Sequence, residues 1–171
     1  MGYLRGICLL GAGLASAIAL AGCGFTPLYA TPGLSRGLST IDVVAPQGRI
    51  AFLMRQDLDD ALGRDKTATP EYRLDLNVNQ NRAPRGLRLD NVAERYALTV
   101  MVDYTLTSIA TGKPVHTGQV ISQVSYDAAD APYAGISARQ NTQEKVALDA
   151  ARRIQVDLAA WMARKARGAD Q

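Results

Sequence analysis

The sequence of 171 residues carries 19 Lys and Arg against 16 Asp and Glu, with one histidine and two cysteines. Its formal net charge of +3 is unremarkable, so any functional charge has to be sought in local clusters. So few cysteines and histidines do not supply the ligand set of a zinc site, and glycine-rich phosphate-binding motifs are absent. We therefore expect no metal, no cofactor and no enzymatic activity.

The first 22 residues have the layout of a secretory signal. Arg5 lies near the start, an apolar run extends from Ile7 to Leu20, and small residues follow. The apolar run is shorter than the roughly 20 residues that span a bilayer. It ends in Leu20-Ala21-Gly22-Cys23, which looks like a lipobox, where small residues fit the cleavage site and a thiol carries a diacylglyceryl thioether. We expect residues 1–22 to be removed and Cys23 to be lipidated.

Lipidation at Cys23 has two consequences. Each buried CH₂ of an acyl chain contributes about 0.8 kcal/mol, so two or three chains make a permanent membrane anchor. The other cysteine, Cys8, leaves with the signal, so the mature chain has no internal disulfide. Residues 23–40, which are rich in Pro, Gly, Ser and Thr, are predicted to be an extended tether between the anchor and the folded domain.

The folded part is predicted to begin with a short strand and an amphipathic helix. Residues 41–44 form an apolar run that stops before Pro46, as is typical of a brief strand. After Gly48, apolar residues recur at helical spacing, and Gly63 is a stop signal. The apolar stripe of this helix is expected to contain Ile50, Leu53, Met54, Leu58, Ala61 and Leu62.

Three further strands are predicted from alternating apolar and polar residues. Residues 72–78 alternate in this way, and residues 96–106 continue the pattern over the longest such stretch. A turn at residues 110–113 leads into a strand over residues 115–126. The last two strands are therefore expected to form an antiparallel hairpin.

The C-terminal part predicts a long helix and completes the fold. From about Gly135 onward there is no proline, and one helical face contains Ala147, Ala150, Ala151, Ile154, Leu158, Trp161 and Met162. The element order is β-α-β-β-β-α, and each element has one apolar face. We expect an α+β fold in which two helices cover one face of a four-stranded, mostly antiparallel sheet. Residues 41–165 are predicted to form this single domain, and residues 166–171 a tail.

Several of these features resemble the LptE family of lipopolysaccharide-assembly lipoproteins. They are the signal and lipobox, the opening Cys23-Gly24-Phe25-Thr26-Pro27-Leu28-Tyr29, the segment Ala93-Glu94-Arg95-Tyr96, and the element order. The resemblance implies a lipoprotein that plugs the large outer-membrane β-barrel LptD, assists its assembly and binds lipopolysaccharide. Gly24 agrees with outer-membrane sorting, because it is not the Asp that retains lipoproteins in the inner membrane of enteric-type bacteria.

A predicted loop at residues 81–92 carries the basic residues that best suit this ligand. Arg82, Arg85 and Arg88 are interleaved there with leucines. A guanidinium fork matches phosphate oxygens and leucines suit acyl chains, a combination that fits lipid A. Arg88 stands near the position of a basic lipopolysaccharide contact in the family, and Arg139 is a second candidate by a looser alignment. The other interpretation is a solvated loop whose arginines only keep it soluble.

Two other functions remain open from the sequence. One is an auxiliary lipoprotein of an envelope ABC transport system for other lipids, which acts in the periplasm without a barrel. The other is a structural lipoprotein that stabilises an envelope complex and binds no lipid. Copurification of a barrel of about 80 kDa or more separates these functions from an LptE-like one.

Overall fold

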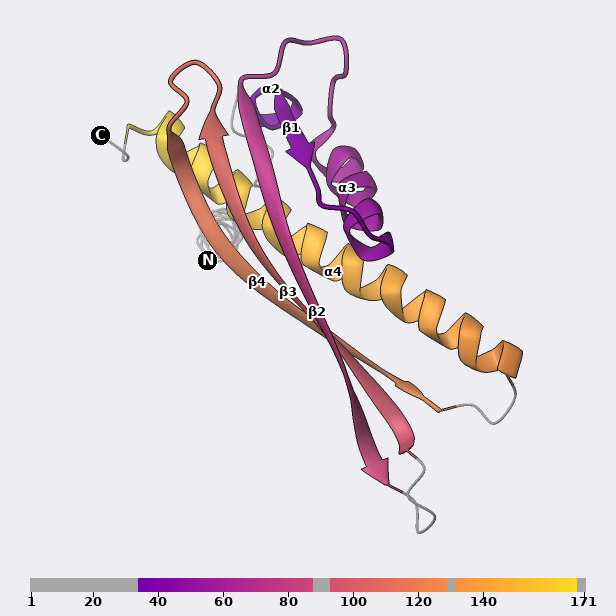
Figure 1. Ribbon diagram of the computed structural model, residues 1–171. Coiled ribbons are helices and arrows are strands. Elements are labelled where there is room, and N and C mark those ends of the chain that lie inside the picture. The colour runs from indigo at the N-terminus through magenta and orange to yellow at the C-terminus, as the bar shows by residue number, and fades with distance from the viewer. Residues whose placement is uncertain (1–33, 88–92, 129–131, 169–171) are drawn as a thin grey trace, which may run out of the picture. The chain divides into compact units, whose positions relative to one another are not determined.

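The computed structural model describes residues 34–87, 93–128 and 132–168, all within the compact unit Thr31–Gln171 (Figure 1). Cys23 and Arg88 lie outside the described residues. The elements in chain order are α2 (Leu34–Ser39), β1 (Ile41–Val44), α3 (Arg49–Leu62), β2 (Tyr72–Leu87), β3 (Ala93–Ser108), β4 (Pro114–Asp127) and α4 (Pro132–Ala166).

The four strands form one sheet in the order β1-β2-β3-β4. β1 pairs in parallel with the first four residues of β2, whereas the β2–β3 and β3–β4 pairs are antiparallel. The predicted α+β class and the predicted hairpin of the last two strands are confirmed. The structure adds a third helix, α2, to the two that the sequence predicts.

The helix α3 has the apolar face that its sequence predicts. Ile50, Met54, Leu58 and Leu62 are buried. Gly63 ends the helix in the left-handed conformation with φ of 63°, a conformation that costs glycine little because it has no Cβ. Its backbone N–H donates to carbonyl oxygens of the last turn, which would otherwise lack a partner.

The helix α4 is the longest element, with 35 residues and a length of about 50 Å. It begins at Pro132, slightly before the predicted start near Gly135, and proline suits a first helical turn because no hydrogen bond is lost there. Figure 1 shows α4 running along the sheet. All seven residues of its predicted apolar face are buried: Ala147, Ala150, Ala151, Ile154, Leu158, Trp161 and Met162.

A single hydrophobic core joins the helices to one face of the sheet. Alternate residues of the strands supply the sheet side of this core, namely Ile41, Val43, Tyr72, Leu74, Leu76, Leu98, Val100, Val102, Tyr104 and Leu106. The opposite face of the sheet is mostly polar, with Asn77, Asn79, Thr99 and Gln123 among its residues, although Ile121 is 54% exposed there. Among the described residues, the helices therefore cover one side of the sheet.

The structure corrects the predicted loop at residues 81–92, because β2 continues through its first part to Leu87. Arg82 pairs with Leu98, Arg85 with Arg95, and Leu87 with Ala93. Pro84 is tolerated because β1 pairs only with residues 72–75, so the later part of β2 is an edge with β3 as its neighbour. Arg82 and Arg85 are thus strand residues, and their side chains have defined directions.

The structure also differs from the predicted extended tether, because residues 34–39 form the helix α2. The side chain of Leu38 is only 1% exposed and belongs to the core. Gly37 lies against Met162 of α4, where a Cβ would come within 2.9 Å of its sulfur. Tertiary contacts with α4, rather than helix propensity, account for a helix of this length.

Candidate functional site

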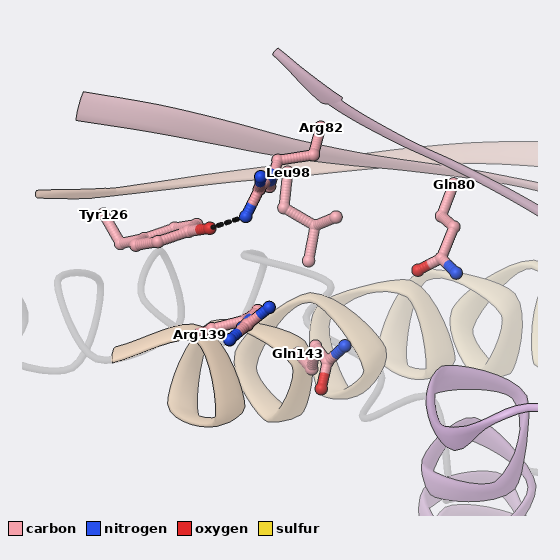
Figure 2. Close-up of a pocket in the computed structure, with 6 residues that line it drawn as sticks. All are labelled: Gln80, Arg82, Leu98, Tyr126, Arg139 and Gln143. Carbon is pink, nitrogen blue, oxygen red and sulfur yellow. Dashed lines mark hydrogen bonds between the residues drawn. The ribbon is translucent and has the colours of Figure 1, made fainter. Parts of the chain in front are cut away.

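A pocket lies between the end of the sheet formed by the last residues of β2 and β4 with the first residues of β3, and the first half of α4. Its volume is about 300 Å³. Figure 2 shows side chains of the sheet and of α4 pointing toward each other across it. We call it the arginine pocket, and it is lined by Gln80, Arg82, Leu98, Tyr126, Arg139 and Gln143.

Strand register explains which sheet residues enter this pocket. Residues directly opposite each other on neighbouring strands share a face of the sheet. Arg82 is opposite Leu98, and Tyr96 is opposite Tyr126, so these four side chains lie on the face toward α4. The period of two that places Leu98 in the core also places Arg82 at the arginine pocket.

Two tyrosines hold the Arg82 side chain at the pocket. Its guanidinium carbon lies 4.5 Å from the ring centre of Tyr96, a cation–π contact. Its Nη1 donates to the Tyr126 hydroxyl at 3.5 Å, which is a weak hydrogen bond. The rings of Tyr96 and Tyr126 stack with centres 5.7 Å apart. The sheet therefore presents a guanidinium on an aromatic platform.

The helix α4 supplies the facing wall through Arg139 and Gln143, one helical turn apart. Arg139 is exposed. Within the segments that the structure describes, no carboxylate lies within ion-pair distance of Arg82 or Arg139. Two guanidinium groups that have no carboxylate partner among the described residues thus lie beside Leu98, and they suit an anion that carries apolar groups.

Arg85, another basic residue that the sequence predicts, is not part of this pocket. Arg85 is opposite Arg95, whose Nε donates to Asp127 at 2.8 Å, and these residues lie on the sheet face away from the helices. Of the four arginines named from the sequence, the structure thus brings Arg82 and Arg139 together and separates Arg85 from them. Arg88, like Cys23, is not among the described residues.

The sequence interpretation missed the residues that complete the pocket. Tyr96 and Leu98 were recognised as strand residues but not as neighbours of Arg82. Gln80 and Gln143 carry no sequence signal that distinguishes them from other surface amides. The alternation of residues 96–106 indicates which of their side chains face the core. Antiparallel pairing with the preceding strand then places Tyr96 on the same face as Arg82 and close to it.

A second polar cluster fastens the C-terminal half of α4 to the sheet. Asp157 accepts a hydrogen bond from the Tyr104 hydroxyl at 2.5 Å, and Nε2 of His116 lies 2.5 Å from the same carboxylate oxygen. Burial alone would raise the pKa of Asp157, but the hydrogen bonds from His116 and Tyr104 outweigh it and lower this pKa below its ordinary value. Burial and the nearby carboxylate raise the pKa of Tyr104. This cluster therefore keeps Tyr104 neutral and Asp157 ionised.

The described residues contain no group of three His, Cys, Asp or Glu side chains that is placed to hold a metal ion. None of the helices in these same segments is long and apolar enough to cross a membrane.

Solved structures of bacterial lipoproteins resemble this chain. A crystal structure described as a lipoprotein from Caulobacter crescentus CB15 is 48% identical to this chain, with a TM-score of 0.68. The match covers 78% of this chain and 97% of the Caulobacter chain. Rare lipoprotein B from Shewanella oneidensis is 15% identical, with a TM-score of 0.56, covering 72% and 95%. Lipoprotein B from Nitrosomonas europaea is also 15% identical at a TM-score of 0.56, covering 72% and 83%. At this identity the last two share the fold.

A comparison with curated proteins gives no match. The family described as "LptE: Lipopolysaccharide-assembly" matches residues 38–160, a stretch that includes all four strands, α3 and most of α4. The family named from the sequence is confirmed by this match. The chain belongs to the LptE family of lipopolysaccharide-assembly lipoproteins.

Proposed function

We propose that this protein is an outer-membrane lipoprotein, anchored through Cys23, that binds lipopolysaccharide in the arginine pocket and acts with an LptD-type β-barrel. The family match supports the role in lipopolysaccharide assembly. The observation that carries the binding site is the placement of Arg82 and Arg139 on opposite walls of one pocket.

The ligand chemistry follows from the lining of the pocket. Phosphate groups attract divalent cations, which bridge neighbouring lipid A molecules and hold them in aggregates. Two guanidinium groups can replace such a cation, because each offers several N–H donors to phosphate oxygens. Leu98 and the ring of Tyr126 provide apolar contacts beside the charges. A bound molecule would thereby be separated from its aggregate.

The proposed barrel partner is supported by the uncovered face of the sheet. This face is largely polar, as the side chains around Asn77, Asn79 and Thr99 illustrate. The lumen of a large outer-membrane barrel is polar as well. A sheet with one polar face therefore suits contact with the wall of such a lumen, or with the water that fills it.

The test is affinity purification of the lipidated protein from detergent-extracted membranes. We expect a barrel of about 80 kDa or more at equal stoichiometry, with lipopolysaccharide in the purified complex. The double variant Arg82→Glu/Arg139→Glu is expected to retain the barrel and lose most of the lipopolysaccharide, whereas Arg85→Glu retains both. Absence of a barrel contradicts the partner, and equal lipopolysaccharide in all three proteins contradicts the site.

A further inference from the structure

The end of the domain opposite the arginine pocket carries an excess of basic side chains. It is formed by α2, the loop 63–71, the turn 109–113 and the last turn of α4. Hydrogen bonds join these segments: Asp65 N–H donates to the Ser39 carbonyl, Ile109 N–H to the Glu71 carbonyl, and Lys165 Nζ to the Tyr72 hydroxyl. We call this region the basic end, and its exposed cations are Arg36, Lys66, Lys113, Lys165 and Arg167.

Few carboxylates neutralise these five cations. Asp65 accepts hydrogen bonds from Thr67, Glu71 is exposed nearby, and Asp42 is paired with Arg64 at 3.4 Å. Among the described residues of these four segments, seven Lys and Arg stand against the two carboxylates of Asp65 and Glu71. The neighbouring Asp42 and Asp59 reduce the surplus to three positive charges. Positive charge is therefore in excess at this end.

The helix dipole accounts for part of this concentration. Lys165 and Arg167 lie at the C-terminus of α4, where cations are favoured by about 0.3–1 kcal/mol. Lys66 and Lys113 belong to a loop and a turn, and Arg36 belongs to a helix of six residues. The dipole of α4 does not explain these three.

Apolar side chains are exposed among the cations. The side chains of Ile109 and Val115, at the turn between β3 and β4, are 49% and 38% exposed. Beside Ile109 is a hollow of about 360 Å³ that Pro70, Tyr72 and Ala110 also line. Exposed aliphatic side chains beside the turn that carries Lys113 suit the boundary between lipid headgroups and acyl chains.

The chain itself brings this end close to a bilayer. Leu34, the first residue of α2, follows Cys23 by eleven residues, a stretch that spans at most about 40 Å when fully extended. A lipid on Cys23 would therefore keep the basic end within reach of headgroups at a high effective concentration. This step rests on the proposed anchor.

We propose that the basic end docks on the anionic phospholipid surface of the leaflet that holds the anchor. Docking fixes the orientation of the domain, because Arg82 lies ten residues along β2 from Tyr72, about 30 Å from the basic end. The arginine pocket is thereby held away from the anchoring leaflet. Phospholipid headgroups at one end and the proposed lipopolysaccharide site at the other do not compete.

The experiment uses the lipidated chain in vesicles with a thiol introduced as Thr111→Cys and labelled with an environment-sensitive fluorophore. A thiol introduced as Asn79→Cys on the uncovered sheet face is the control label. Vesicles contain phosphatidylethanolamine with phosphatidylglycerol, or phosphatidylcholine alone. We expect a blue shift and protection from aqueous iodide at position 111 in the anionic vesicles only, and none at position 79.

Charge variants decide between docking and simple proximity. Lys66→Glu/Lys113→Glu is expected to lower the ratio of docked to undocked protein by roughly tenfold or more, because each cation near an anionic surface contributes to binding. Arg55→Glu/Arg152→Glu makes the same change in net charge elsewhere and is expected to have little effect. Raising NaCl to about 0.5 M abolishes docking.

Three outcomes overturn the proposal: equal signals in neutral and anionic vesicles, equal loss in both charge variants, or no protein on either vesicle. Lipopolysaccharide binding by Lys66→Glu/Lys113→Glu in detergent separates this proposal from the function of the arginine pocket. We expect that binding to be unchanged. If the unaltered protein does not bind lipopolysaccharide, the proposed function is contradicted, and docking on phospholipid vesicles can still be measured.

Discussion

Arg82 on β2 and Arg139 on α4 line the same pocket, although they come from opposite layers of the domain. The ring of Tyr96 holds the Arg82 guanidinium by a cation–π contact, and α4 places Arg139 on the facing wall. Two positive charges that face one cavity without a carboxylate between them repel each other. The anion proposed for the arginine pocket would relieve this repulsion and bridge the sheet and the helix.

Removal of the aromatic platform should weaken lipopolysaccharide binding without unfolding the domain. Tyr96→Leu keeps an apolar side chain but removes the cation–π contact with Arg82, which contributes about 0.5–1 kcal/mol at an exposed site. We expect the Kd for lipopolysaccharide to rise about two- to fivefold, measured by titration of the purified protein. Tyr126→Phe is the matched control, because it retains the ring and loses only a hydrogen bond of 3.5 Å. An effect of Tyr126→Phe as large as that of Tyr96→Leu contradicts this ranking.

The Asp157 cluster predicts a dependence of stability on pH. Because its pKa is lowered in the folded state, Asp157 contributes stability above its unfolded pKa of about 3.9, and this contribution is lost as the pH falls through the folded value. Asp157→Asn is expected to lower the free energy of unfolding by about 1 kcal/mol at pH 7, since the carboxylate is partly exposed. Urea unfolding at pH 7 and pH 3 measures this, and the difference between the two proteins should shrink at pH 3. The exposed Asp60→Asn serves as control, and an undiminished difference at pH 3 would refute the linkage.

Gly118 makes room for the same cluster. It is opposite Tyr104, and a Cβ at this position would overlap the hydroxyl and the ring of that tyrosine. Gly118→Ala must displace Tyr104 from Asp157, so we expect a loss of about 2 kcal/mol or more in the free energy of unfolding. Adding Tyr104→Leu removes the clash, and the double variant should lose less than the sum of the single variants. Strict additivity of the two losses would show that the close approach does not matter.

Leu38 tests whether α2 belongs to the folded domain. Its side chain is 1% exposed and contacts the core, so Leu38→Ala is expected to lower the free energy of unfolding by about 2–4 kcal/mol. Ser35→Ala, an exposed change in the same helix, should alter it by less than about 0.5 kcal/mol. Denaturant unfolding of the two variants gives both values. A negligible effect of Leu38→Ala would favour the tether that the sequence predicts up to residue 40.

Elements with a clear hydrophobic period could be predicted from the sequence. The face from Ala147 to Met162 is buried as the period of 3.6 predicts, and the stripe from Ile50 to Leu62 is buried except for Leu53 and Ala61, which are partly buried. The hairpin of β3 and β4 followed from alternation and a turn in the same way. In these elements the local sequence pattern and the burial in the folded domain agree, so the fold class could be predicted from the sequence.

The elements that escaped prediction depend on neighbours. Pro84 and Gly86 are typical of a loop, yet β2 continues past them because one edge of the strand has no partner that needs the missing N–H. The helix α2 is too short and too rich in Ser and Gly to be stable alone, and Leu38 stabilises it by burial. Likewise, a basic cluster in the sequence did not reveal that Arg82 and Arg85 lie on opposite faces, since that requires the strand. Only the fold brings Arg139 to Arg82.

Binding of lipopolysaccharide to purified single variants tests the arginine pocket most directly. Arg82→Glu, Arg139→Glu and Arg85→Glu change the net charge equally, but the first two alter the pocket and the third alters the opposite face of the sheet. Loss of a hydrogen bond to a charged group costs about 1.5–3 kcal/mol, which corresponds to a Kd about 10- to 150-fold higher for the two pocket variants. We predict this rise for Arg82→Glu and Arg139→Glu and a change of less than about threefold for Arg85→Glu. Equal losses in all three variants, or none, would contradict the account.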